Sequence, residues 1–117
     1  MLAEQIVEIM AEANEAAYEA AKELAFKFEL EGRFTGCGFA WIELYEFDGR
    51  RIKGKTKIGK QMKKAGIRQN YQRVFDIWNP SGYPTQDVSV LEAGAQAAAE
   101  VFKKHGFNKV YACSRLD

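Results

Sequence analysis

The sequence predicts an α+β domain in which a long N-terminal helix precedes a mostly antiparallel sheet of about four strands, in the order α-β-β-α-β-α-β. Three observations favour this class. Residues 1–31 contain neither glycine nor proline and show helical spacing of apolar residues, Asp48–Gly49 is a strong two-residue hairpin turn, and helical patterns separate the later strands. The 117 residues predict a single domain, with the helix at 1–31 and an α+β body at 37–117.

The N-terminal helix is amphipathic and long for a chain of this size. Its apolar residues recur every three or four positions: Leu2, Ile6, Met10, Ala13, Ala17, Ala20, Leu24 and Phe28. Gly32 is a natural end for the helix. At about 1.5 Å per residue the helix would span roughly 40–45 Å, which exceeds the ~13 Å radius of gyration of a 100-residue domain. We therefore expect either a break near Asn14 or packing of part of the helix on a second subunit.

The first strand has the sequence FAWIELYEF, from residue 39 to 47. Its odd-numbered positions are aromatic apart from Glu43, and its even-numbered positions from Ala40 to Leu44 are aliphatic. Because successive side chains of a strand point to opposite faces, the aromatic and aliphatic sets lie on different sides of the sheet. Glu43 interrupts the aromatic row, so we expect that face to be only partly buried.

After the hairpin turn the chain becomes strongly cationic. We expect a short return strand over Arg50–Lys55, at the edge of the sheet. Thr56 can then cap a short helix over about 57–64, which Gly66 closes.

The C-terminal part alternates strand and helix. QRVFDIW, at 72–78, reads as a strand, and Ser89–Glu92 forms a capping box that opens a helix over about 90–105. Gly106 ends that helix, and NKVYACSRL, at 108–116, reads as the final strand.

Charge is strongly segregated along a chain whose net charge is only +1. Residues 1–31 hold eight glutamates and two lysines, whereas residues 49–75 hold ten basic residues and no acidic one. We call these ten the basic segment: Arg50, Arg51, Lys53, Lys55, Lys57, Lys60, Lys63, Lys64, Arg68 and Arg73. They predict a phosphate-binding surface for nucleic acid or a nucleotide, in which Gly54 and Gly59 allow close backbone approach. Two alternatives are an acidic protein partner and pairing with the acidic helix, within one molecule or across a dimer.

A second candidate site surrounds the loop NPSGYP. A strand-end Trp and a loop Tyr could sandwich a base while polar side chains read its edge; these residues are Trp78, Asn79, Ser81 and Tyr83. The alternative is a core Trp78 followed by an ordinary turn. Arg115 is a further candidate contact, or else an ion-pair partner or a neighbour of Asp117.

Catalysis and metal binding have little support in the sequence. The only soft ligands are Cys37, Cys113 and His105, with no local pair, so neither a zinc site nor another cofactor is expected. A nucleophile pair needs a histidine beside a thiol, and nothing in the sequence places His105 there. We expect both cysteines to be reduced, buried and inert, and the protein not to be an enzyme. No apolar run approaches the ~20 residues of a membrane span, so we expect a cytosolic protein that does not contact membranes.

Four short motifs in order resemble a family. CGFAW (37–41), WNPSG (78–82), EAGA (92–95) and SRLD (114–117) together resemble a group of small, mostly uncharacterised proteins of tailed bacteriophages. The resemblance covers about residues 35–117. It implies a phage origin and action in the host cytoplasm, and it brings no established activity.

The resulting prediction is a small non-enzymatic protein that binds nucleic acid or a nucleotide through its basic segment. For a phage, the purpose implied by the resemblance is interference with host defence or metabolism. The alternative is a protein–protein inhibitor of a host protein, or a homo-oligomeric module such as a homodimer, working through the N-terminal helix.

Overall fold

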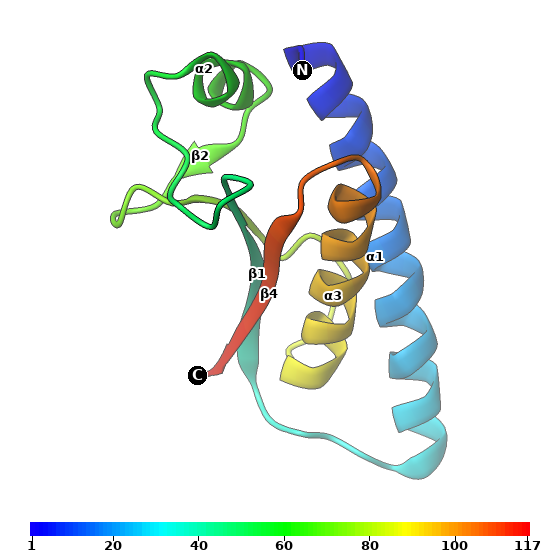
Figure 1. The fold of residues 1–117 in the computed structure, drawn as a ribbon. Coiled ribbons are helices and arrows are strands. Elements are labelled where there is room, and N and C mark those ends of the chain that lie inside the picture. Colours follow the sequence, from blue (N-terminus) through cyan, green and yellow to red (C-terminus); the bar gives the residue numbers. More distant parts are fainter.

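The computed structural model describes residues 1–117 and contains three helices and four strands (Figure 1). In chain order they are α1 (Ala3–Glu31), β1 (Gly38–Tyr45), α2 (Lys57–Lys64), β2 (Arg68–Gln69), β3 (Phe75–Trp78), α3 (Val88–Lys104) and β4 (Lys109–Leu116). The predicted α+β class, the long first helix and the four-stranded antiparallel sheet are confirmed. The predicted element order holds with two differences. The predicted return strand after β1 is reduced to a single bridge, and the two-residue strand β2 is added.

The four strands form one antiparallel sheet in the order β2-β3-β1-β4. Together with α2 and α3 this is the split β-α-β-β-α-β topology, to which α1 is added at the N-terminus. α3 packs on β1 and β4, and α1 packs along α3, so both long helices lie on one side of the sheet (Figure 1). The other side, which we call the open face, has no helix layer over it.

α1 is continuous and spans the molecule. Its 29 residues extend about 44 Å at 1.5 Å per residue, close to the 47 Å long dimension of the fold. The expected break near Asn14 does not occur. Gly32, in the left-handed conformation with φ 64°, ends the helix as predicted. The buried stripe includes Ile9 and Ala21, whereas Leu2 is 60% exposed, so the stripe differs slightly from the predicted one.

The main core lies between the sheet and the helices. The aliphatic set of β1, from Ala40 to Leu44, is buried there as predicted, together with Phe75 and Phe102. The short helix α2 adds Met62, which is fully buried. The aromatic residues of β1 therefore face away from the core.

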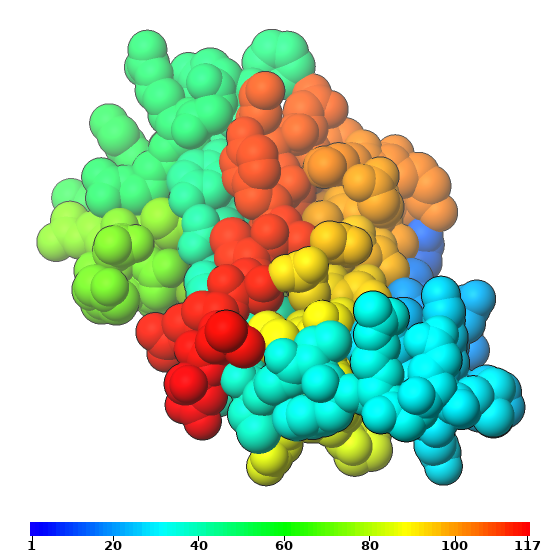
Figure 2. Space-filling model, turned by 90° about the horizontal axis from the view of Figure 1, so that it is seen from below, coloured from blue at the N-terminus to red at the C-terminus, as the bar shows by residue number.

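The connection after α1 is held by a buried carboxyl group. Asp87 accepts hydrogen bonds from the Thr35 backbone N–H (2.9 Å) and hydroxyl (2.6 Å), and from the N–H groups of Ser89 and Val90 at the start of α3. The helix cap is thus Asp87, and the prediction that Ser89 caps α3 is wrong. The segment between α1 and β1, cyan in Figure 2, lies against the C-terminal end of β4. There the Asp117 N–H donates to the Cys37 carbonyl oxygen.

Two predicted strands differ in extent. The return strand Arg50–Lys55 is reduced to one bridge between Tyr45 and Arg51. The strand predicted at 72–78 begins only at Phe75, because residues 70–74 form a turn in which the side-chain oxygen of Asn70 accepts from the backbone of Gln72 and Val74. None of the helices combines the length and the apolar character that a bilayer crossing requires.

Candidate nucleic-acid interface

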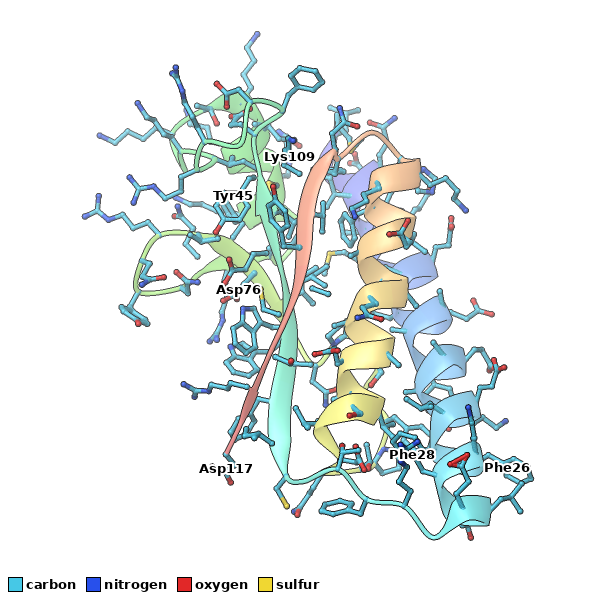
Figure 3. All side chains as sticks on the ribbon, turned by 60° about the horizontal axis from the view of Figure 1, so that its bottom comes forward. Phe26, Phe28, Tyr45, Asp76, Lys109 and Asp117 are labelled. Atoms are coloured by element: carbon cyan, nitrogen blue, oxygen red, sulfur yellow. The ribbon has the colours of Figure 1, made fainter.

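The basic segment forms a solvated cationic surface. All ten of its side chains are exposed, and nitrogen-tipped side chains project outward around α2 and its loops (Figure 3). α2 begins where the Thr56 hydroxyl accepts from the Gly59 N–H (3.1 Å), as predicted, and is anchored by the bond from the Ala3 N–H to the Gln61 side chain (2.8 Å). Only Arg50 and Arg68 lie in ion pairs, with Asp48 and Asp76, so eight basic groups have no acidic partner.

The acidic residues of α1 do not neutralise this surface within the molecule. No ion pair joins α1 to the basic segment; the α1 carboxylate that is paired across elements, Glu12, contacts Lys104 (2.5 Å) and His105 (3.0 Å) at the end of α3. Hydrogen bonds from those two side chains lower the pKa of Glu12. The intramolecular pairing alternative therefore does not describe the monomer.

Gly59 has a packing role rather than the ligand-contact role predicted for it. A methyl group built on its Cα would overlap the backbone carbonyl oxygen of Lys53. The absence of a side chain therefore lets α2 pack against the preceding loop.

Aromatic side chains cluster on the open face. Trp41 and Trp78 lie opposite each other on β1 and β3, with ring centroids 5.0 Å apart, and Phe39 meets Trp78 edge-on at 5.8 Å. The guanidinium of Arg115 lies 5.5 Å from the centre of the Phe39 ring. Phe39 and Trp78 remain about 40% exposed. The face therefore presents aromatic rings to solvent on the two central strands, beside a cationic group.

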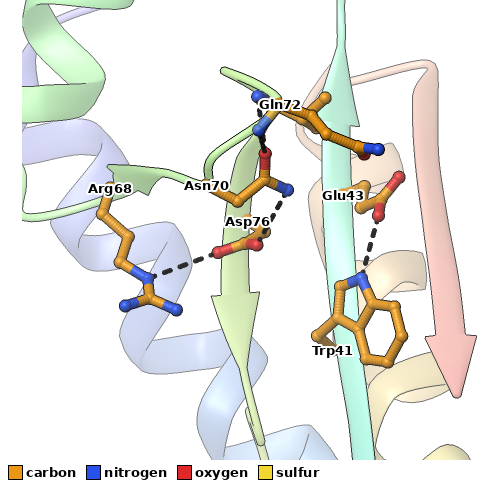
Figure 4. Close-up of polar contacts among 7 residues, drawn as sticks. Trp41, Glu43, Arg68, Asn70, Gln72 and Asp76 are labelled. Atoms are coloured by element: carbon orange, nitrogen blue, oxygen red, sulfur yellow. Dashed lines mark hydrogen bonds and ion pairs between the residues drawn. The ribbon is translucent and has the colours of Figure 1, made fainter. Parts of the chain in front are cut away.

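A carboxylate stands in the middle of this face. Glu43 accepts hydrogen bonds from Trp41 Nε1 (2.9 Å) and from the Tyr45 hydroxyl (2.7 Å), its neighbours on the same side of β1 (Figure 4 shows the former). Burial, and secondly the hydrogen bond to Glu43, raise the pKa of Tyr45 to about 12. Tyr45 therefore stays a hydrogen-bond donor across the neutral range, and the Glu43 carboxylate is fixed from both ends.

A second carboxyl group, Asp76, faces Glu43 across the β1–β3 pair and is only 4% exposed. Its Oδ2 accepts from the Asn70 side chain (3.1 Å), while its buried Oδ1 has no hydrogen bond and lies 3.6 Å from Nε of Arg68 (Figure 4). Figure 3 shows Tyr45 and Asp76 on the side of the sheet away from the two long helices, α1 and α3. Asp76 thus orients Arg68 and, through Asn70, the β2–β3 turn.

Three adjoining hollows connect the aromatic cluster to the basic segment. The first, of about 400 Å³, is lined by both tryptophans, Glu43, Arg68 and Arg115 among others, and extends to Gln69. Gln69 also lines the second, of about 260 Å³, whose walls include Arg51, Lys53, Lys55 and Arg73. Arg51 and Lys53 continue into a third of about 380 Å³ with Arg50. Each hollow thus shares lining residues with the next, and we call the three together the track: it has tryptophan rings at one end and mostly basic groups along the rest, with Glu46 and Asp48 in the third hollow.

The second predicted site is divided by the fold. Trp78 and Arg115 line the same hollow on the open face. Ser81 is buried, where its hydroxyl accepts from the Tyr83 N–H (3.1 Å) and contacts Asn79 (3.2 Å), and the Tyr83 ring packs on Tyr18. The predicted sandwich of a base between Trp78 and Tyr83 is therefore not formed.

The site also contains residues that the sequence reasoning did not select, namely Phe39, Trp41, Glu43 and Tyr45. The sequence could have identified them by their odd-numbered positions in β1, because alternate residues of a strand share one face. Glu43 within the row predicted a face that is only partly buried, which the structure confirms; the row did not show that this face lies beside Trp78 and Arg115.

The cysteines form no nucleophilic pair. Cys37 is exposed, with its thiol 3.4 Å from the Gln86 side chain, so the prediction that it is buried is wrong. Burial, followed by the charge of Glu43, raises the pKa of Cys113 to about 11, which keeps that thiol protonated at neutral pH. His105 is held by Glu12. No group of three or more potential metal ligands is present.

Comparison of the chain with protein-family models, curated proteins and solved structures finds no match in any of the three. The resemblance to tailed-phage proteins stays a prediction.

Proposed function

We propose that this protein binds single-stranded nucleic acid across the open face of its sheet and along the basic segment, without catalysing a reaction. The observation that carries the proposal is the track that leads from exposed Trp78, which Phe39 contacts edge-on, to unpaired basic side chains. Stacking of bases on aromatic rings and neutralisation of phosphates by a basic groove are the two contributions that single-strand binders combine.

The arrangement favours a single strand over a duplex. The aromatic rings lie on the sheet surface, where only unstacked bases can reach their faces. A duplex keeps its bases stacked inside and would meet the protein through phosphates alone. Double-stranded probes should therefore bind more weakly and respond only to changes in the basic segment.

The distribution of charge on the open face indicates how a bound single strand would lie. The centre of the open face holds Glu43 and Asp76, which repel phosphate, whereas Arg68 and Arg115 line the same hollow and the basic segment follows. Bases would therefore lie over the centre and phosphates along the cationic rim. A free nucleotide would occupy only the first hollow and leave most of the basic segment unused.

The resemblance to phage proteins extends the proposal to a cellular role. A phage protein of this kind would act in the host cytoplasm and interfere with host defence or nucleic-acid metabolism. A cross-linking experiment in infected cells that recovers host or phage nucleic acid with the protein would support this role.

A second candidate function, a homo-oligomeric or protein-binding module, is favoured by the far end of α1. Phe26 and Leu30 are 64% and 74% exposed there, and Phe34 in the following loop is 62% exposed. These residues lie at the opposite end of the molecule from α2 (Figures 1 and 3). The two functions therefore use different surfaces and can be tested separately.

Fluorescence polarisation with labelled oligonucleotides tests nucleic-acid binding. A thymidine 12-mer and a duplex of similar length are titrated at low and physiological salt. For the single strand we expect the logarithm of the affinity to fall by about 0.7 per phosphate contact for each tenfold rise in salt. Binding of neither probe at low salt would refute the proposal.

Variants separate the two contributions to affinity. Trp78→Ala removes a stacking platform and should cost about 1–3 kcal/mol of binding to the single strand, with little effect on the duplex. A fourfold change to Gln should weaken both probes and flatten the salt dependence; it alters Arg50, Arg51, Lys53 and Lys55. A control variant loses the same four positive charges outside the basic segment, and it should bind both probes as tightly as wild type. It changes to Gln the residues Lys22, Lys27, Arg33 and Lys103.

A further inference from the structure

We propose that the first hollow of the track is a base-reading subsite that selects guanine, with Glu43 as the acceptor for the Watson–Crick edge of the base and Trp78 as its stacking platform. This inference rests on the proposed function, because it names the base that the nucleic-acid site prefers. It is supported by the geometry of the carboxylate, the pattern of donors on the four bases and the placement of the arginines.

The Glu43 carboxylate is oriented before any ligand arrives. Trp41 and Tyr45 stand on either side of it along β1 and each donates one hydrogen bond to a different oxygen. A carboxylate has about four lone-pair sites, so each oxygen keeps one for a ligand. Glu43 is half-buried and lines the hollow together with both tryptophans. A base that stacks on an exposed tryptophan here would bring its edge to a fixed pair of acceptors.

Guanine alone among the common bases matches two adjacent acceptors. Its ring N1–H and its 2-amino group are neighbouring donors. Adenine and cytosine each place a ring-nitrogen acceptor beside their amino group, and thymine or uracil flanks its single N–H with two carbonyl oxygens. Since an ionised carboxylate only accepts, each of these other bases would set an acceptor against it.

The electrostatic environment of the hollow is consistent with a neutral donor ligand at its centre. Cys113, opposite Trp41 on β4, has a raised pKa because of burial, then because of the charge of Glu43 and a hydrogen bond with it, and last because of the charge of Asp76. The same field opposes a phosphate there and strengthens a hydrogen bond from N–H groups. Arg68 and Arg115 also line the hollow, where they can receive the phosphates on either side of the stacked base.

Asp76 is a positioning residue in this arrangement. It is buried, bonds to Asn70, and has one oxygen without a hydrogen bond 3.6 Å from Nε of Arg68. Arginine has five N–H donors, so the terminal nitrogens of Arg68 remain free for phosphate. Asp76 therefore sets where Arg68 stands relative to the base pocket.

Single-base substitution in a weakly structured oligonucleotide tests the preference. Probes are thymidine 12-mers in which one central base is thymine, adenine, guanine or hypoxanthine; a single guanine avoids quadruplex formation. Binding is followed by polarisation and by intrinsic fluorescence, because Trp41 and Trp78 are the chain's two tryptophans and both line the hollow. We expect the guanine probe to bind roughly 5- to 150-fold more tightly than the thymine probe, with stronger quenching. Hypoxanthine, which lacks the 2-amino group, should lie between them.

Two variants tie the preference to the carboxylate. Glu43→Gln should remove the guanine preference while the thymine probe binds as tightly as before or more tightly, because one repelling charge is lost. Glu100→Gln removes the same charge from an exposed position on α3 and should leave both affinities unchanged. Circular dichroism of each variant verifies that the fold is retained.

The outcomes distinguish this inference from the proposed function. Equal affinity for the four probes, with salt-dependent binding retained, would overturn guanine selection and leave single-strand binding standing. If no oligonucleotide binds at low salt, single-strand binding is overturned. Guanine selection is then overturned too, unless free guanosine monophosphate quenches the tryptophan fluorescence more than free adenosine monophosphate does. That last result would keep the base pocket and replace nucleic acid by a free nucleotide. A guanine preference that survives in Glu43→Gln would refute the role of Glu43.

Discussion

Asp87→Ala should destabilise the protein by removing a connection between two distant segments. The carboxyl group is 4% exposed and accepts four hydrogen bonds, two from Thr35 after α1 and two from the first turn of α3. Residue 87 also forms an isolated bridge with Cys37, which leads into β1. The substitution therefore loosens the helix start and the approach to the central strand together.

The magnitude follows from the bonds that are lost. Loss of a helix N-cap costs about 1 kcal/mol. The bonds from Thr35 to an ionised acceptor add roughly 1–2 kcal/mol, at the low end for charged pairs because Thr35 itself is exposed. A total of about 2–3 kcal/mol is a large fraction of the 5–15 kcal/mol typical of a folded domain. Ser89→Ala, which removes no cap, should change stability by less than about 0.5 kcal/mol.

The stability difference between wild type and Asp87→Ala should depend on pH in one direction. Burial alone would raise the pKa of Asp87, but the hydrogen bonds from Thr35, Val90 and Ser89 outweigh it and lower the pKa. A carboxyl group with a depressed folded-state pKa stabilises the fold above its unfolded pKa of about 3.9 and loses that stabilisation as the pH falls through the folded value. The difference should therefore be constant near neutrality and shrink below about pH 4.

Urea unfolding followed by circular dichroism measures both effects. Asp87→Asn is the control, because it keeps an acceptor for the helix start but cannot ionise. Its free energy of unfolding should lie between those of wild type and Asp87→Ala. The difference between its stability and that of wild type should also shrink in acid. A wild-type stability within 0.5 kcal/mol of Asp87→Ala at pH 7 would refute the reasoning. So would a deficit that grows on acidification.

Three further predictions concern other parts of the molecule. Gly59→Ala should destabilise by about 1–3 kcal/mol in thermal unfolding, because the new methyl group overlaps a backbone carbonyl; equal stability would show that α2 shifts freely. Iodoacetamide at pH 8 should modify exposed Cys37 well before Cys113, whose pKa is about 11, as followed by mass spectrometry of intact protein; faster loss of Cys113 would contradict the burial described. Light scattering after size-exclusion chromatography should show a dimer that Phe26→Glu with Leu30→Glu converts to monomer, whereas a wild type that is monomeric at high micromolar concentration would exclude self-association through α1.

Much of the local structure could be predicted because its determinants are neighbours in the chain. The three- and four-residue spacing of apolar side chains set the extent of α1, Gly32 ended it, and Thr56 began α2. Alternation in β1 separated a buried aliphatic face from an aromatic one. The basic segment was also predicted as a charged surface, because lysine and arginine without acidic neighbours usually remain in water, but only the structure showed that it does not pair with the acidic helix in the monomer.

The candidate site depended on contacts between segments far apart in sequence. Trp41 meets Trp78 only through the register of β1 with β3, and Glu43 meets Asp76 through the same pairing. Alternation within one strand shows which residues share a face, but it does not show which strand lies beside it or whether a layer covers that face. The sequence therefore predicted the aromatic row and, from Glu43, its partial exposure, whereas the tertiary structure decided that Trp78 and Arg115 lie beside it.

The helix cap illustrates the same division. Ser89 and Glu92 have the spacing of a capping box, and local reasoning selected them. In the folded chain Asp87 takes the position instead, because its carboxyl group also satisfies Thr35, more than fifty residues away. Local sequence determined that a helix begins near residue 88, and a distant hydrogen-bond partner decided which side chain begins it.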